Sequence, residues 1–231
     1  GEDIVSSDGS SVVTISAAEG VGTAGAIDTA VALVDVTNTA SGNIDLNETD
    51  AIGINGIDQQ VASGTVNVDA GGTITVIAGQ SGITVIDGTV ELDANGIDSS
   101  IVINEAIGTT TGAVNLLADN DVSFGAGGSV SASTGAAVTV TADVDSAADS
   151  GGTDQGAVTM TDGSSIGAGS GLIDIDANEA VTVSRLVTSN NTASAVTITS
   201  VAGGVVDGGD TGGEDIVSSG GSSVVTISAA E

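Results

Sequence analysis

Residues 64–70 read GTVNVDA, residues 88–94 read GTVELDA, and residues 171–177 read GLIDIDA. In each stretch a glycine precedes two aliphatic residues that are separated by one polar residue. This alternation predicts a short β-strand with one buried face. A glycine that recurs at one position indicates a corner that needs a positive φ or a close approach of two backbones.

Pairs of aliphatic residues two positions apart recur along the whole chain. Three consecutive steps between their first members share one 24-residue length, whereas a later 15-residue step indicates a misplaced boundary nearby. The pairs are Val13/Ile15, Ile44/Leu46, Val66/Val68, Val90/Leu92, Val114/Leu116, Val138/Val140, Val158/Met160, Ile173/Ile175, Val196/Ile198 and Val225/Ile227. A glycine stands two residues before six of them, at Gly42, Gly64, Gly88, Gly112, Gly156 and Gly171.

An eight-residue spacing subdivides the 24-residue unit. Val114, Val122, Val130 and Val138 are each eight residues apart. Three sides of eight residues close one triangular coil, and each strand then pairs with its counterpart in the next coil. The sequence therefore predicts an all-β protein, a right-handed parallel β-helix (β-solenoid). We expect coils of about 24 residues and about nine coils in a 212-residue period.

A longer repeat joins the two ends of the chain. Residues 1–19 and 213–231 are identical except for Asp8 and Gly220, at a 212-residue offset. Near-identity over this length indicates tandem duplication. We interpret residues 1–212 as one full period of a β-solenoid array and residues 213–231 as the start of the next period. A duplicated end motif within one domain is the alternative.

The composition excludes several classes of function. The chain has 231 residues, with 36 Gly, 31 acidic residues, one basic residue, a net charge of −30, and no Cys, His, Pro, Trp or Tyr. Without Cys or His there is no thiol nucleophile, no Ser-His triad, no disulfide and no ordinary zinc or haem ligand set. One Arg does not make a nucleic-acid-binding surface. No apolar run is long enough to span a bilayer, so we expect no membrane insertion.

The negative charge is dense along the expected axis. Residues 1–212 carry a net charge of −27, which over nine coils stacked ~4.8 Å apart is about one charge per ~1.6 Å, close to double-stranded DNA. No cofactor is required, but divalent cations such as Ca²⁺ are expected to bind loosely and to bridge neighbouring shafts. The candidate ligands point outward on one side and place like charges on successive coils; a solvated acidic face is the alternative. They are Asp45, Asp69, Glu91, Asp93, Asp174 and Asp176.

Two side chains test the coil scheme. Phe124 has the parity of Val122 and is expected to fill a wide part of the core. Arg185 has the parity of Val181 and Val183, so a continued strand would bury it. Because an unpaired buried cation is costly, we expect the strand to end before Arg185, which then lies at a solvated corner; a salt bridge to a nearby Asp is the alternative.

The GxVxVxA-type units at 64–70, 88–94 and 171–177 resemble those of filamentous-haemagglutinin-like surface proteins. They are also similar to repeats of giant bacterial surface and matrix proteins. The resemblance covers most of the chain and rests on its composition. It implies secretion, a β-helical shaft, and a role in adhesion or in extracellular fibres.

The function that follows is structural. We expect a stiff, acidic repeat segment of a filament or adhesin shaft, outside the cell or on its surface, which associates with itself head to tail or laterally and is not an enzyme. The alternatives are immunoglobulin-like adhesin repeats with calcium sites and a β-helical polysaccharide-active enzyme. A third is a binding face built from a regular threonine array, as in some ice-binding solenoids. Thr139/Thr141 and Thr159/Thr161 lie in adjacent coils, but Asp174/Asp176 break the array before Thr197/Thr199.

Overall fold

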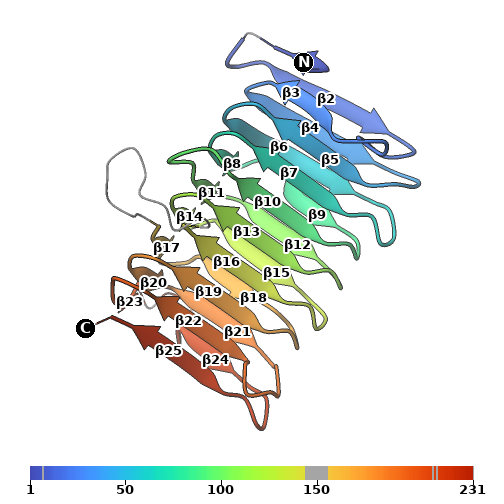
Figure 1. Cartoon of the computed structure of the whole chain (residues 1–231). Helices are drawn as coiled ribbons and strands as arrows, with labels where there is room; N and C mark the ends of the chain where they lie inside the picture. Colours follow the sequence, from blue (N-terminus) through green and yellow to red (C-terminus); the bar gives the residue numbers. More distant parts are fainter. Residues whose placement is uncertain (7, 144–155, 210, 212, 231) are drawn as a thin grey trace.

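The computed structural model describes residues 1–6, 8–143, 156–209, 211 and 213–230. Within these ranges the chain forms β-strands and no helix, and every strand pairing is parallel. The coils are stacked in one direction, so the N-terminus lies at one end of the solenoid and the C-terminus at the other (Figure 1). No helix of the described part is long and apolar enough to cross a membrane.

The first face of the coil is a ten-stranded parallel sheet. Eight complete turns separate its first strand, β1, from β22, and β25 follows one turn later. Its strands are β1 (Ile4–Val5), β3 (Ile27–Ala30), β5 (Ile44–Glu48), β7 (Val66–Ala70), β10 (Val90–Ala94), β13 (Val114–Ala118), β16 (Val138–Ala142), β19 (Ile173–Ala177), β22 (Val196–Ser200) and β25 (Val225–Ala229).

The second and third faces form one 15-stranded sheet that is continuous through long strands near the N-terminus. These strands, which run along both faces, are β2 (Val12–Ala17), β4 (Leu33–Asn38) and β6 (Ile52–Gln59). The second face continues with β8 (Ile74–Val76), β11 (Ile101–Ile103), β14 (Val122–Phe124), β17 (Val158–Met160), β20 (Val181–Val183) and β23 (Val205–Asp207). The third continues with β9 (Gly82–Val85), β12 (Ala106–Thr109), β15 (Ser129–Ala132), β18 (Ser165–Gly167), β21 (Arg185–Thr188) and β24 (Ile216–Ser218).

The register confirms the coil length and the eight-residue side. Val66, Val90, Val114 and Val138 are stacked as direct partners, each separated from the next by the predicted 24-residue step. Within one coil, Val114, Val122 and Val130 lie on the first, second and third faces, and all three are buried. The triangular coil predicted from the sequence is therefore confirmed.

Two aliphatic pairs lie on other faces than the sequence spacing indicates. Val138 pairs directly with Ile173, whereas Val158 lies on the second face between Val122 and Val181. The coil from Val138 to Ile173 is longer than the regular one and includes 144–155, which lie outside the described residues. This explains the anomalous 15-residue step.

Val13 and Ile15 are the second correction. They pair with Val34 and Val36 of β4, not with the strand of Ile44. Two of the ten aliphatic pairs recognised in the sequence therefore lie on other faces than the remaining eight. Alternation alone could not separate the faces, because the interior of all three is aliphatic.

The two test residues lie as a closed coil requires. Phe124 is 1% exposed and is stacked between Ile103 and Met160 on the second face, which confirms its place in the core. Strand β20 ends at Val183, and Arg185 begins β21, paired with Ser165. The predicted strand end is confirmed. Arg185 is partly buried and starts a new strand, rather than lying in solvent at the corner itself.

The immunoglobulin-like alternative is wrong. Such sandwiches are built from antiparallel strands, whereas every pairing among the described strands is parallel and joins successive coils.

The recurrent glycines lie where coils touch at a corner. An added Cβ at Gly88 would lie 1.9 Å from the carbonyl oxygen of Gly64, and one at Gly112 would lie 1.8 Å from that of Gly88. Gly42 and Gly156 instead adopt positive φ angles, of 80° and 135°. Both reasons proposed for the glycines, close approach and positive φ, therefore operate, at different positions.

We predict that Gly88→Ala destabilises the protein by about 1–3 kcal/mol, because the methyl group forces two coils apart. The matched control is Gly108→Ala, since an added Cβ at Gly108 meets nothing within 4 Å and the substitution also lowers the entropy of the unfolded chain. Urea unfolding followed by circular dichroism measures both. Equal stability of the two variants would show that the corner tolerates a side chain.

Candidate functional surface: the polar columns of the first face

The outward side chains of the first face form two columns along the solenoid. The leading column holds the residue after the first buried position of each strand, and the trailing column holds the residue after the second. The leading column reads Asp45, Asn67, Glu91, Asn115, Thr139, Asp174, Thr197 and Thr226. The trailing column reads Asn47, Asp69, Asp93, Leu117, Thr141, Asp176, Thr199 and Ser228.

The leading column alternates carboxylates with amides in its first four coils. The Asn67 amide donates a hydrogen bond to Asp45 over 3.0 Å, and the Asn115 amide donates one to Glu91 over 3.3 Å. The strand of Asn67 also lies between the strands of Asp45 and Glu91, so these two carboxylates are not direct partners. The sequence prediction that acidic residues stack on one another is therefore wrong for this column, where amide donors take the place of a cation.

The trailing column contains one direct stack of like charges. Asp69 and Asp93 are partners on adjacent strands, and Glu91 lies on the same strand as Asp93. The Asn95 amide donates a hydrogen bond to Asp69. Burial, followed by the charges of Asp69 and Glu91, raises the pKa of Asp93 above the usual value for aspartate.

Asp174 and Asp176 both point outward from β19, and hydroxyl side chains surround them. Asp174 lies between Thr139 and Thr197. Burial, and then the charge of Asp176, raises the pKa of Asp174. The prediction that Thr139 and Thr159 lie on the same side of adjacent coils is wrong, because Thr159 lies on the second face.

Other carboxylates hold turns of a neighbouring coil. Glu105 accepts a hydrogen bond from the backbone N–H of Gly79 over 2.9 Å, and Asp121 accepts one from Ala157 over 2.8 Å. Asp87 likewise accepts one from Ser63. The N–H groups of Gly79 and Ser63 lie in turns, and that of Ala157 lies just before β17. The carboxylates supply these groups with the acceptor that a backbone carbonyl would otherwise provide. Part of the acidity of the chain is therefore structural.

Three buried carboxylates among the described residues were not predicted from the sequence, namely Glu48, Asp119 and Asp143. Glu48 is 1% exposed, and its oxygens accept hydrogen bonds from the Thr29 hydroxyl at 2.7 Å and from the Val31 N–H at 3.0 Å. The sequence does contain a sign of this buried position. The stacked partners of Glu48 in the next two coils are alanines, Ala70 and Ala94, so a glutamate departs from the repeat there.

A second buried polar group lies at the corner between the third and first faces. Asn38 and Gln59 are both fully buried and stacked, and the Asn38 amide donates to the Gln59 side-chain oxygen over 3.0 Å. Both side chains also donate to the carbonyl of Gly42. They complete the hydrogen bonds of a corner whose backbone turns away from the ladder.

The six predicted metal ligands occupy three places. Asp69, Glu91 and Asp93 lie on adjacent strands, Asp174 and Asp176 share β19, and Asp45 lies beside Asn67. Among the described residues, no three carboxylates are grouped so as to hold a metal ion. Calcium binding stays a prediction.

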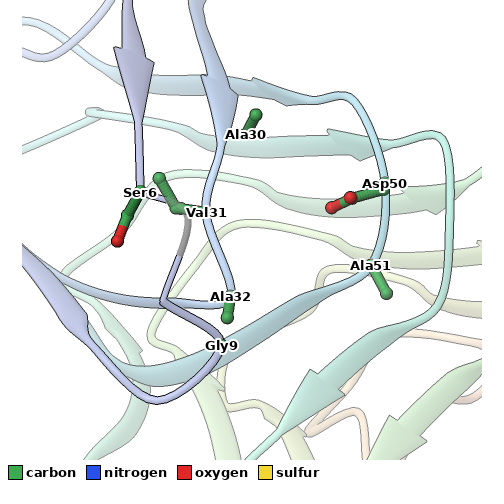
Figure 2. Close-up of a pocket in the computed structure, with 7 residues that line it drawn as sticks. All are labelled: Ser6, Gly9, Ala30, Val31, Ala32, Asp50 and Ala51. Atoms are coloured by element: carbon green, nitrogen blue, oxygen red, sulfur yellow. The ribbon is translucent and has the colours of Figure 1, made fainter.

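A shallow hollow lies near the N-terminal end of the solenoid (Figure 2). Among the described residues that line it, Asp50 is the one titratable side chain. The lining residues are Ser6, Gly9, Ala30, Val31, Ala32, Asp50 and Ala51.

No family model, curated protein or solved structure matches this chain. The resemblance to filamentous-haemagglutinin-like proteins therefore stays a prediction, and inferences about function rest on the architecture and on the surface just described.

We predict that Asp93→Asn stabilises the protein at pH 7 by about 0.2–1 kcal/mol, because it removes a like-charge pair. The raised pKa means that the folded state binds the Asp93 proton more tightly than the unfolded state does. The contribution of Asp93 to stability therefore falls as pH rises through this pKa, and the benefit of the substitution disappears in acid. Asp45→Asn, which removes the same charge beside an amide, is the control. Equal gains from the two variants would assign the effect to net charge alone.

We predict that Glu48→Gln destabilises the N-terminal coils by about 1–3 kcal/mol, because an amide nitrogen would face hydrogen-bond donors. Glu91→Gln, at an outward position, is the control. Hydrogen exchange at the Val31 amide measures the effect locally. Unchanged protection at Val31 would contradict a structural role for the carboxylate.

Proposed function

We propose that this chain is a repeat segment of a β-helical shaft that lies outside the cell or on its surface. The observation that carries the proposal is a tandem sequence repeat in a fold that grows by adding coils. We propose no catalytic role, no required cofactor, and no nucleic-acid or membrane partner. The partner is the chain itself, in tandem or head to tail, with lateral association of shafts.

The ladder supports a mechanical role. Successive coils are joined by parallel backbone hydrogen bonds on all three faces. Among the described residues, the interior holds one cluster of buried and mostly aliphatic side chains that runs from Val21 to Ile198. A load along the axis is therefore carried at each coil boundary by the hydrogen bonds of all three faces, and the shaft resists bending because these faces are coupled through one core.

The last coil leaves its interior side chains open. Val196 and Ile198 are fully buried, whereas their partners Val225 and Ile227 are 39% and 51% exposed. Exposed strand edges of this kind are templates for further pairing. Because residues 213–231 repeat residues 1–19, the copy of the residues that follow 1–19 supplies the next coil in a tandem array.

The charge supports a hydrated shaft whose packing depends on salt. At about one negative charge per ~1.6 Å of axis, neighbouring shafts repel each other unless counterions condense on them. We propose that divalent cations bridge shafts through the trailing column, where Asp69 and Asp93 are stacked. Secretion fits a chain with one basic residue and no cysteine, because few sites remain for trypsin-like proteases or for oxidation.

Electron microscopy of frozen-hydrated protein tests the shaft. We expect rods with a meridional reflection near ~4.8 Å, and longer or bundled rods in calcium than in chelator. Magnesium distinguishes the cation modes, because diffuse screening responds to both ions and a discrete calcium site does not. Globular particles without this reflection would overturn the proposal.

End-to-end association has a matched pair of variants. Ile227→Lys places a charge on the open interior of β25, whereas Thr226→Lys places the same charge on its outward face. If the chain associates through its ends, sedimentation shows shorter assemblies for Ile227→Lys than for Thr226→Lys. Equal lengths would show that the open end is not the contact.

A further inference from the structure

We infer that the 212-residue period advances the coil by eight and two-thirds turns, so that successive periods are rotated by 120° about the axis. The inference rests on the proposed tandem array and adds the geometry by which one period joins the next. It comes from the two copies of the repeated segment, which the structure places on different faces.

In the first copy, Ile4 lies on the first face, as a partner of Thr29. The strand VVTISA that follows, β2, lies on the second and third faces. Val13 pairs with Val34, and Ile15 pairs with Val36, in the strand that also pairs with β6.

In the second copy, the first segment lies one face earlier, and the strand that spans the second and third faces in the first copy lies on the first face alone. Ile216 lies on the third face, as a partner of Leu186. The strand with Val225 and Ile227 lies on the first face, as a partner of β22. Figure 1 shows β2 in the row of β4 and β6, and β25 in the row of β22 and β19.

The turns between the copies can be counted along the sheets. From β1 on the first face, β22 is eight turns away, and β24 lies two faces further along the coil. The count along the sheets decides the rotation, because eight and two-thirds turns and nine whole turns both give a mean turn close to the 24-residue step between Val66 and Val90. The sequence spacing by itself indicates whole turns, with Val13 level with Ile44.

One sequence can occupy different faces because it meets the same environment on each. The segment presents Val13, Ile15 and Ala17 inward in the first copy and Val225, Ile227 and Ala229 inward in the second. All three faces line their interior with stacked aliphatic side chains. Alternation determines which side chains point inward. The face on which the strand lies is determined by the lengths of the coils before and after it.

The rotation determines what an array shows to its surroundings. The leading and trailing columns lie on one side of one period, a third of a turn away in the next, and return to the first side after three periods, which is 26 whole turns. Each period rises about 42 Å at ~4.8 Å per coil. Such a shaft presents the same polar columns in three directions, so neighbouring shafts meet equivalent surfaces on every side.

Engineered disulfides test the register, because the chain has no cysteine of its own. Stacked residues lie about 4.8 Å apart, within the Cα–Cα range of about 4.4–6.8 Å for disulfides. Thr14 and Thr226 are equivalent positions in the two copies, and both face outward. The three double variants are Thr14→Cys/Asp35→Cys, Thr197→Cys/Thr226→Cys and Thr14→Cys/Asp45→Cys.

We expect the first two variants to oxidise within one chain, with complete loss of titratable thiol, and the third to retain both thiols. A disulfide between positions 14 and 45 would give whole turns and overturn the rotation, as would failure of the pair 197/226. Single-cysteine variants control for disulfides between chains, and circular dichroism controls for folding.

The symmetry of imaged filaments gives an independent measurement. A rotation of 120° for each axial rise of about 42 Å supports the inference, and an unrotated repeat of whole turns overturns it. The crosslinks report the register whether or not arrays form. Absence of rods with the expected crosslinks would therefore contradict the proposed function alone, and rods with a 14/45 disulfide would contradict the rotation alone.

Discussion

The parallel backbone ladder between coils is the constraint on which the rest of the structure depends. Each strand hydrogen-bonds to strands about one coil before and after it, so every coil must offer inward side chains, corners and outward side chains at matching heights. The columns of aliphatic residues, the close approach of Gly64 and Gly88, and the polar columns of the first face all follow from this stacking. A substitution at one residue therefore alters packing against the coils on both sides of it.

The acidic composition has a structural explanation as well as a functional one. Carboxylates accept hydrogen bonds from asparagine amides in the leading column, from turn N–H groups at the corners, and, at Glu48, from a buried hydroxyl and backbone N–H groups. Each of these contacts gives a carboxylate a hydrogen-bond donor that is not a basic side chain. Asp93 is stacked directly on Asp69, with no amide between the two carboxylates, and this is the pair through which we propose that counterions act.

Much of the fold could be predicted because the coil length and the side length of a solenoid recur as fixed spacings in its sequence. The 24-residue step and the eight-residue side correspond directly to stacked partners, as Val114, Val122 and Val130 show. The buried place of Phe124 and the strand end before Arg185 followed from parity and the cost of burying a charge. For the candidate site, the sequence pattern predicted the outward carboxylates but not their amide partners. It also did not predict Glu48, because the alanines at the equivalent positions can be recognised only once the strands are aligned in register.

Local alternation by itself determined which residues face inward, because side chains in a strand point alternately to its two sides. It could not determine the face on which a strand lies, since three aliphatic interiors accept the same pattern. Only the stacked structure places Val158 on the second face and gives the two copies of VVTISA different faces. That choice depends on the summed lengths of all intervening coils, including the long coil after Val138, and is therefore a property of the whole stack.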